Sequence, residues 1–157
     1  MPDEPVQPGN RRFYRRIKSD QWQDETRQAL QDTVFSLREG EAGLSVFDTA
    51  EASPRAVLEY LLQEWDAIAL KSERDARWAA KQRAIHGETV EGLLESGWGV
   101  AEVSEALFLR SGFQPSPYTE RNGHLEILGM KEAFEEKSLD IIDDPECRIL
   151  SVEECLA

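Results

Sequence analysis

The longest regular pattern of hydrophobic and polar positions lies between Pro54 and Gly87, a stretch without internal proline or glycine. Ser53 is suited to cap a helix here, Pro54 to occupy its first turn and Gly87 to end it. The pattern therefore predicts one helix over about 54–86, roughly 48 Å long at 1.5 Å per residue. Apolar residues in its first half follow the 3–4 spacing of a face packed on a core, namely Val57, Leu58, Leu61, Leu62, Trp65, Ile68 and Ala69.

The second half of this predicted helix carries a different pattern. Its apolar positions are mostly alanines, while basic residues and one tryptophan line up on another face. A helix of this length is longer than the core of one domain requires, so residues 71–86 are predicted to project. Such a face can be a solvated surface, but tryptophan and arginine are also the residues that most often anchor interfaces. We predict four partner-binding residues on it: Arg74, Arg77, Trp78 and Lys81.

Shorter patterns predict the rest of an α+β fold, with a small, mostly antiparallel sheet, the long helix and a helix pair. Residues 1–10 are expected to form a disordered leader before a single domain at 11–157. Alternating or β-branched runs predict strands at 12–17, 33–37, 44–47, 124–128 and 147–152. Helical patterns bounded by glycine or proline predict helices at 88–95, 100–110 and 131–142.

The charge of the chain is unevenly distributed. Its formal net charge is −13, and residues 87–157 hold 16 acidic and 5 basic side chains, whereas residues 1–86 hold 15 and 13. An acidic half favours a partner with a basic surface, or imitation of nucleic acid, and makes direct nucleic-acid binding improbable. A basic run at 11–18 opposes this trend and either pairs with the acidic half or contacts an anion.

No motif in the sequence specifies a reaction. Phosphate-binding glycine loops, HExxH, GxSxG, paired CxxC and calcium-loop patterns do not occur. One enzymatic alternative is a small anion-handling hydrolase or transferase, in which Arg15 or Arg16 binds a phosphate and His124 acts as acid or base. We predict no cofactor and no metal, and interpret one acidic group as a solvated turn: Asp140, Asp143, Asp144 and Glu146.

Two resemblances extend this interpretation. The succession RRFYRRI, TVF, GLSVF, WGVAEVSEALFLRSGF and GHLEILGMK resembles a pattern in small uncharacterised bacterial α+β proteins, which implies one integral domain. Residues 88–109, ETVEGLLESGWGVAEVSEALFL, are similar to the first two helices of transposase helix-turn-helix domains. That similarity implies DNA binding, although Gly112, Pro115 and Pro117 interrupt the segment where a recognition helix would begin.

The sequence thus predicts a non-enzymatic accessory or regulatory protein that binds another protein. The bacterial resemblance places it in a defence or toxin–antitoxin type of assembly. Three alternatives remain: an acidic nucleic-acid mimic, the anion-handling enzyme and a helix-turn-helix DNA binder. The polar, proline-rich beginning and the absence of a long apolar run predict a cytoplasmic protein without membrane contact.

Overall fold

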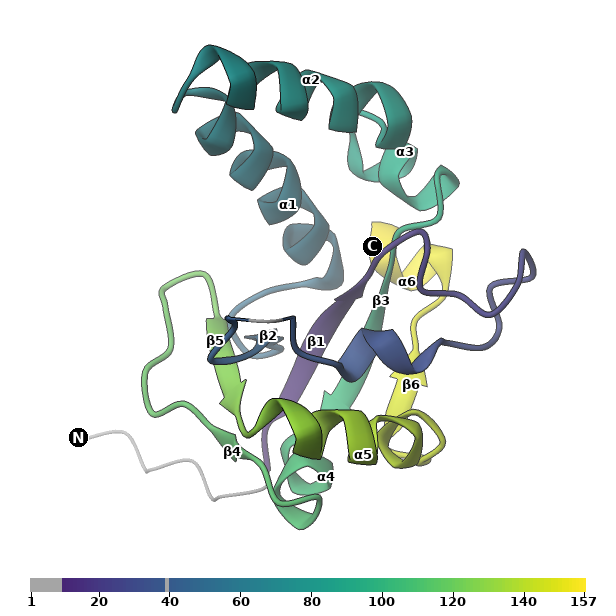
Figure 1. Cartoon of the computed structure of the whole chain (residues 1–157). Coiled ribbons are helices and arrows are strands. Elements are labelled where there is room, and N and C mark those ends of the chain that lie inside the picture. Colours follow the sequence, from purple (N-terminus) through teal and green to yellow (C-terminus); the bar gives the residue numbers. More distant parts are fainter. Residues whose placement is uncertain (1–9, 39) are drawn as a thin grey trace, which may run out of the picture.

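The structure, a computed structural model, describes residues 10–38 and 40–157. Its centre is a six-stranded sheet in the order β4-β5-β2-β1-β3-β6, in which all neighbouring strands are antiparallel (Figure 1). The α+β class is therefore confirmed. The strands are β1 (Arg12–Ile17), β2 (Gly43–Asp48), β3 (Gly99–Ser104), β4 (Gln114–Pro115), β5 (His124–Leu128) and β6 (Cys147–Ile149).

Helices cover both faces of this sheet. Alternation in β1 directs Phe13 and Ile17 into a core on one face, whereas Tyr14 packs against a separate cluster on the other. The first face is covered by η1 (Asp32–Phe35), α4 (Glu105–Arg110) and α5 (Lys131–Ile142). The second is covered by α1 (Pro54–Ala69), α3 (Val90–Glu95) and α6 (Val152–Leu156). Two large hydrophobic clusters, separated by the sheet, therefore stabilise the fold, together with a small third one of Phe47, Ala52 and Val57.

The prediction of one continuous helix over 54–86 is wrong, because the helix is interrupted between Ala69 and Glu73. It is a hairpin of α1 and α2 (Glu73–His86), and the two helices pack against each other (Figure 1). Ser72 has an extended backbone, and its Oγ accepts a hydrogen bond from the N–H of Asp75, so it starts a second helix. Folding back buries Ala79 in the same cluster as Trp65. Residues 71–86 therefore pack against α1 instead of continuing its axis.

Two other elements differ from the sequence predictions. Residues 32–35 form the 3-10 helix η1, not a strand, and place Val34 and Phe35 in the core. Residues 99–104 form strand β3, where the sequence predicted the start of a helix at 100–110. Strand β3 pairs with β1 along the full length of β1, and only then does Ser104 cap the short helix α4. Pairing between distant segments decides both cases.

Several local predictions are confirmed or only shortened. The strands at 12–17, 44–47 and 124–128 and the helix at 131–142 occur where the sequence predicts them. The closing strand ends at Ile149, because Ser151 and Glu154 form a capping box that begins α6. The predicted leader at 1–10 lies outside the described residues, except for Asn10. No described helix combines the length and apolar character that a membrane crossing requires.

Candidate functional site

The candidate functional site lies where strands β1 and β2 separate. The two strands pair at only two positions, Phe13 with Asp48 and Tyr14 with Phe47. Beyond Tyr14, strand β1 stays paired with β3 as far as Ile17, but its other edge no longer pairs with β2. A split therefore opens within the sheet, next to the last residues of β1.

The side chain of Arg15 occupies this split. Its Nε donates to the carbonyl oxygen of Val34 at 2.9 Å, and its Nη1 donates to the carbonyl oxygen of Ser45 at 2.8 Å. At Ser45 the guanidinium thus takes the place of the backbone donor that a continued ladder would supply. The pKa of Arg15 is lowered to about 10, first by burial and then by the positive charge of Arg16, so the group stays protonated at neutral pH.

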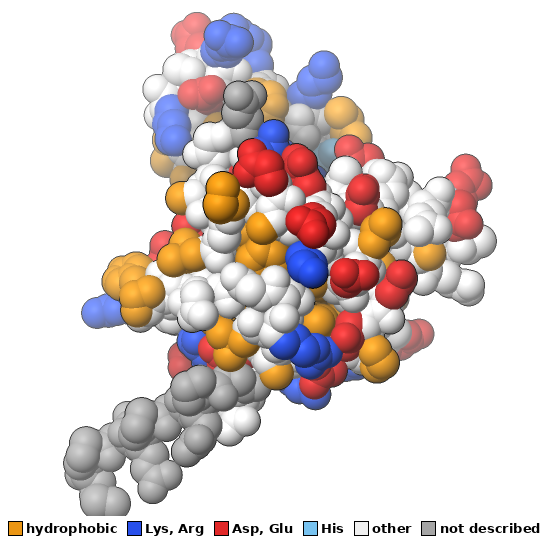
Figure 2. Space-filling model, turned by 60° about the horizontal axis from the view of Figure 1, so that its bottom comes forward, with side chains coloured by type: hydrophobic (Ala, Val, Ile, Leu, Met, Phe, Trp, Pro, Cys, Tyr) orange, Lys and Arg blue, Asp and Glu red, His pale blue; other side chains and the backbone are white. Residues whose placement is uncertain are grey.

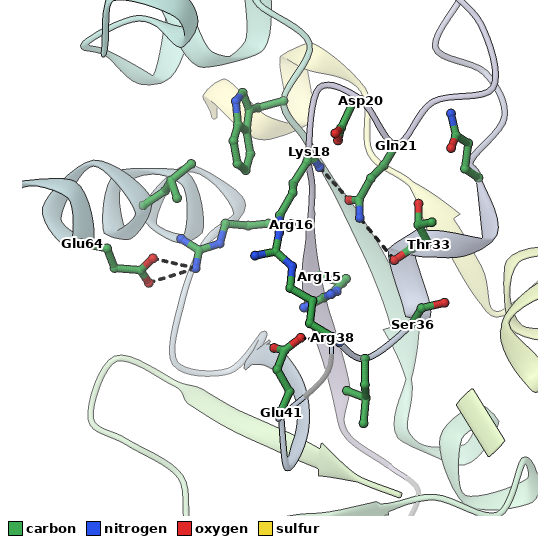
Figure 3. Close-up of a pocket in the computed structure, with 14 residues that line it drawn as sticks. Arg15, Arg16, Lys18, Asp20, Gln21, Thr33, Ser36, Arg38, Glu41 and Glu64 are labelled. Carbon is green, nitrogen blue, oxygen red and sulfur yellow. Dashed lines mark hydrogen bonds and ion pairs between the residues drawn. The ribbon is translucent and has the colours of Figure 1, made fainter. Parts of the chain in front are cut away.

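A pocket of about 630 Å³ opens beside Arg15. The end of β1, the segments flanking η1, helix α1 and Trp98 line it (Figure 3). Its volume is in the range of small-molecule sites. Hydrogen-bond donors dominate its polar lining: Arg15, Arg16, Lys18, Gln21, Thr33, Ser36 and Arg38. Three carboxylates also face it: Asp20, Glu41 and Glu64.

Three of the four cations in this pocket make no ion pair among the described residues. Arg16 pairs with Glu64 at 2.9 Å. Arg15, Lys18 and Arg38 have no such partner. Figure 3 shows Lys18 and Arg38 entering the pocket from opposite sides. With four cations and three carboxylates in its lining, the pocket has a formal charge of +1, in a protein with a formal net charge of −13.

A second pocket of about 410 Å³ continues from the first toward the helical hairpin. The two pockets share Lys18, Arg38 and Trp98, among other residues. Aromatic rings build the hairpin side, where His86 and Trp98 are perpendicular with centroids 5.6 Å apart. His86 Nδ1 and Trp98 Nε1 are buried without a hydrogen-bond partner among the described residues. The two pockets form one groove, polar at the sheet split and aromatic at the hairpin.

The predicted partner-binding residues all lie on α2. Arg74, Arg77, Trp78 and Lys81 are exposed, and Trp78 has 44% of its surface accessible. Arg74 and Trp78 line a third pocket of about 630 Å³ at the turn of the hairpin. Trp78 also lines the second pocket, so it stands between the groove and the hairpin tip.

The residues of the enzymatic alternative are divided between two places. Arg15 and Arg16 line the pocket at the split, whereas His124 on β5 is not among its lining residues. His124 Nε2 lies 3.2 Å from Ser45 Oγ, and its Nδ1 lies 3.3 Å from a carboxylate oxygen of Glu120. The sequence alone does not predict this arrangement, because Ser45 lies on β2, far along the chain from Glu120 and His124. Such a chain can orient a histidine. It adjoins the basic pocket through Phe47, whose ring centroid lies 5.4 Å from that of His124 and 5.3 Å from Cζ of Arg16.

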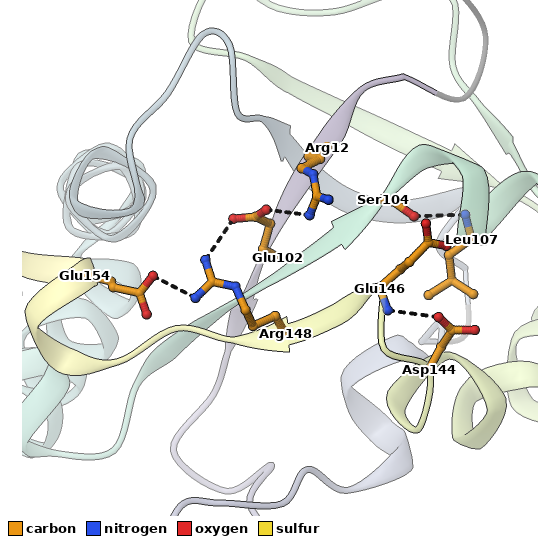
Figure 4. Close-up of polar contacts among 8 residues, drawn as sticks. All are labelled: Arg12, Glu102, Ser104, Leu107, Asp144, Glu146, Arg148 and Glu154. Carbon is orange, nitrogen blue, oxygen red and sulfur yellow. Dashed lines mark hydrogen bonds and ion pairs between the residues drawn. The ribbon is translucent and has the colours of Figure 1, made fainter.

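Many carboxylates of the acidic half are paired with arginines. Figure 4 shows a chain of ion pairs that runs from Arg12 through Glu102 and Arg148 to Glu154. Arg11 pairs with the buried Glu105 in the same way. The predicted basic run is thus divided: its first two arginines pair with two carboxylates of the acidic half, and the later cations line the pocket.

The acidic group interpreted as a solvated turn is part of this pairing. Asp144 and Glu146 both bind the guanidinium of Arg110. A backbone hydrogen bond from Glu146 and then this guanidinium hold the pKa of Asp144 below its usual range. No cluster of three potential metal ligands occurs among the described residues.

Both cysteines are held as thiols. Burial raises the pKa of Cys147 to about 12 and that of Cys155 to about 11. The unfolded chain releases these protons at lower pH than the folded chain. The folded chain therefore becomes less stable as the pH rises from the pKa of an exposed thiol toward the raised pKa values of the folded state. We expect the free energy of unfolding to fall by about 3 kcal/mol between pH 8 and 10, roughly half of it from each thiol, measured by urea denaturation. A Cys155→Ala variant should show a shallower dependence, and an unchanged slope would contradict the assignment to this thiol.

Comparison with protein-family models, curated proteins and solved structures finds no match to this chain. The protein is therefore described by its own fold and candidate site. It is an α+β protein in which a basic groove connects a split sheet with a helical hairpin.

Proposed function

We propose that this chain is a non-enzymatic binding module that docks another protein through its α1–α2 hairpin. The observation that carries the proposal is the surface of the hairpin tip and of the outer face of α2. Large apolar side chains are exposed there next to basic ones. The docking face, as we define it, consists of Leu70, Lys71, Arg74, Arg77, Trp78, Lys81 and Ile85.

Three of the eight large hydrophobic side chains exposed among the described residues lie on this docking face. Leu70 has 88% of its surface accessible, Ile85 57% and Trp78 44%. On α2 the positions 74, 78, 81 and 85 follow helical 3–4 spacing, so their side chains share one side of the helix. A stripe that joins apolar and cationic groups, with tryptophan in the middle, has the composition of interface hot spots.

The charge of the docking face selects the kind of partner. Its four cations, Lys71, Arg74, Arg77 and Lys81, have no ion-pair partner among the described residues. Figure 2 shows Lys and Arg side chains at the end of the molecule where the hairpin lies, and more Asp and Glu over the middle of that view. We infer that the hairpin binds an acidic protein surface. The sequence-based expectation of a partner with a basic surface concerns the acidic half instead.

Replacing Trp78 by alanine tests this proposal. If Trp78 is the central anchor, the variant should bind the partner more weakly by about 2 kcal/mol or more, roughly 30-fold in affinity. The tagged wild-type protein is first used to purify its nuclease-resistant partner from its native host at low salt. Titration calorimetry with that purified partner then compares the two forms.

Leu139→Ala is the matched control. Leu139 is also exposed, at 55%, but lies on α5, which covers the opposite face of the sheet. It should bind the partner like the wild type, and both variants should keep the wild-type melting temperature within a few degrees. Equal affinity of wild type and Trp78→Ala would overturn the proposed docking face. The bacterial defence or toxin–antitoxin assembly rests on the sequence resemblance, and the identity of the purified partner decides it.

A further inference from the structure

We propose that the groove binds a nucleotide, with its phosphate in the pocket at the sheet split and its base toward the hairpin. Three cations surround the phosphate: Arg15, Lys18 and Arg38. The base lies against the exposed part of Trp78. Trp78 belongs to both the groove and the docking face, but this inference does not depend on the docking of a partner protein, because the pocket at the sheet split and its cations lie outside that face.

The cations of the pocket lie close to one another. Besides burial, the positive charges of Arg16 and Arg38 lower the pKa of Arg15, and the carboxylate of Glu41 offsets only part of this repulsion. Ion pairs with described residues do not relieve this repulsion at Arg15, Lys18 or Arg38. An anion in the pocket would relieve it, and would therefore stabilise the folded protein.

The pocket offers more hydrogen-bond donors than its own residues use. Arg15 uses its Nε and one Nη1 hydrogen on the carbonyl oxygens of Val34 and Ser45, which orients the guanidinium and leaves other N–H groups free. Thr33 and Ser36 add hydroxyl groups. A phosphate carries up to two negative charges and several acceptor oxygens, and guanidinium groups match it in a bidentate way. A single carboxylate would use fewer of these donors.

Beyond the pocket at the sheet split, aromatic side chains line the groove. The second pocket shares its cations with the first and adds the rings of Trp78, His86 and Trp98. Nucleobases stack on aromatic side chains. Trp98 is only 8% exposed, yet its Nε1 has no partner among the described residues, and the same holds for His86 Nδ1. Both nitrogens are buried, so the ring open to a base in this pocket is that of Trp78, which is 44% exposed.

A nucleotide unit can be free or part of a single strand. The second pocket shares Ile68 and Trp78 with the pocket at the hairpin turn, which Lys71 and Arg74 line. A strand could therefore continue along the same path, whereas a free mononucleotide would fill the first two pockets alone. Both sources present the same phosphate and base to the groove, and the experiment separates them.

Titration calorimetry and thermal unfolding of the full chain at low salt test the proposal, with inorganic phosphate, AMP and a ten-nucleotide oligo(dT) as probes. We expect AMP to raise the melting temperature and to bind at least 10-fold more tightly than inorganic phosphate. Stronger binding of oligo(dT) than of AMP would assign the site to a strand, and the reverse order to a free nucleotide. Either order supports the proposal.

Variants on exposed segments locate the site without disturbing Arg15. A Lys18→Gln, Arg38→Gln double variant should lose at least 10-fold affinity for every probe that binds. Trp78→Leu should lose affinity for AMP but not for inorganic phosphate. Arg121→Gln is the charge control, because Arg121 is exposed, lies outside the docking face and lines none of the three pockets. Absence of binding at millimolar AMP and oligo(dT), or equal loss in the Arg121→Gln control, would overturn the site.

Discussion

Replacing Trp65 by alanine is expected to lower the free energy of unfolding by about 3–5 kcal/mol. Trp65 is 4% exposed, and its ring lies 6.2 Å from that of Trp98 and 6.1 Å from that of His86, measured between centroids. It joins α1 to α2 and to the segment before β3. Truncation would leave a large cavity between these elements, which rigid helices fill only in part. Urea denaturation followed by circular dichroism measures the effect.

Trp78→Ala provides the comparison within the same hairpin. Because 44% of Trp78 is accessible to solvent, its loss should cost less than about 1 kcal/mol of stability. The two tryptophans are therefore expected to have opposite roles, one in stability and the other in binding. Similar losses of stability in both variants would contradict the division of the hairpin into a packed and a docking side.

Replacing Phe108 by alanine should have an effect of the same size, about 3–5 kcal/mol, on the other face of the sheet. Phe108 is fully buried in α4, with its ring centroid 6.2 Å from that of Phe13 and 6.3 Å from that of Phe35. It therefore joins α4 to β1 and η1, and its removal opens a cavity among three elements. Urea denaturation with the wild type in parallel gives the difference.

The exposed Leu139→Ala is the control here as well and should change stability by less than about 1 kcal/mol. The Phe108 variant also tests how the two hydrophobic clusters are coupled. Both contact the same sheet, so the chain should still unfold in one transition with an unchanged denaturant slope. A second transition would show that the hairpin side unfolds separately.

The proposed nucleotide site follows from a defect in the regularity of the sheet. Strands β1 and β2 separate after two paired positions. The carbonyl oxygen of Ser45 then accepts a hydrogen bond from Arg15 instead of from a backbone N–H of β1. Because the side chain of Arg15 fills the split, a polar pocket opens beside it. Two fully paired strands would leave no space there. Lys18 and Arg38 then concentrate positive charge over this volume. The Lys18→Gln, Arg38→Gln variant separates this site from the docking face, because neither residue belongs to that face.

The difference between local and distant signals explains which elements the sequence predicts correctly. The helix at 131–142 and the start of α1 at Ser53 and Pro54 depend on periodicity and on capping groups within a few residues. The break of the hairpin has a local signal too, since Ser72 is a strong N-cap residue. The sequence pattern nevertheless predicts one continuous helix, because no proline or glycine lies at the turn before Ser72.

The errors at 33–37 and 100–110 have a different origin. The runs TVF and VAEV are apolar enough for a strand or a helix, and periodicity over so few positions does not separate the two. Pairing with the whole of β1 makes residues 99–104 a strand, and packing of Phe35 against Phe108 holds η1 in the core. Contacts between residues far apart in the chain therefore override local preference.

By itself, the sequence determined the α+β class, most boundaries of the regular elements, the buried position of Trp65 and the exposure of the basic face of α2. Each of these depends on the pattern of side chains within one turn or one strand. Only the tertiary structure decided that the helix folds back, that Arg11 and Arg12 are neutralised, and that Arg15, Lys18 and Arg38 meet in one pocket. These outcomes depend on which distant segments pair and where two strands separate, and short-range patterns carry no information about either.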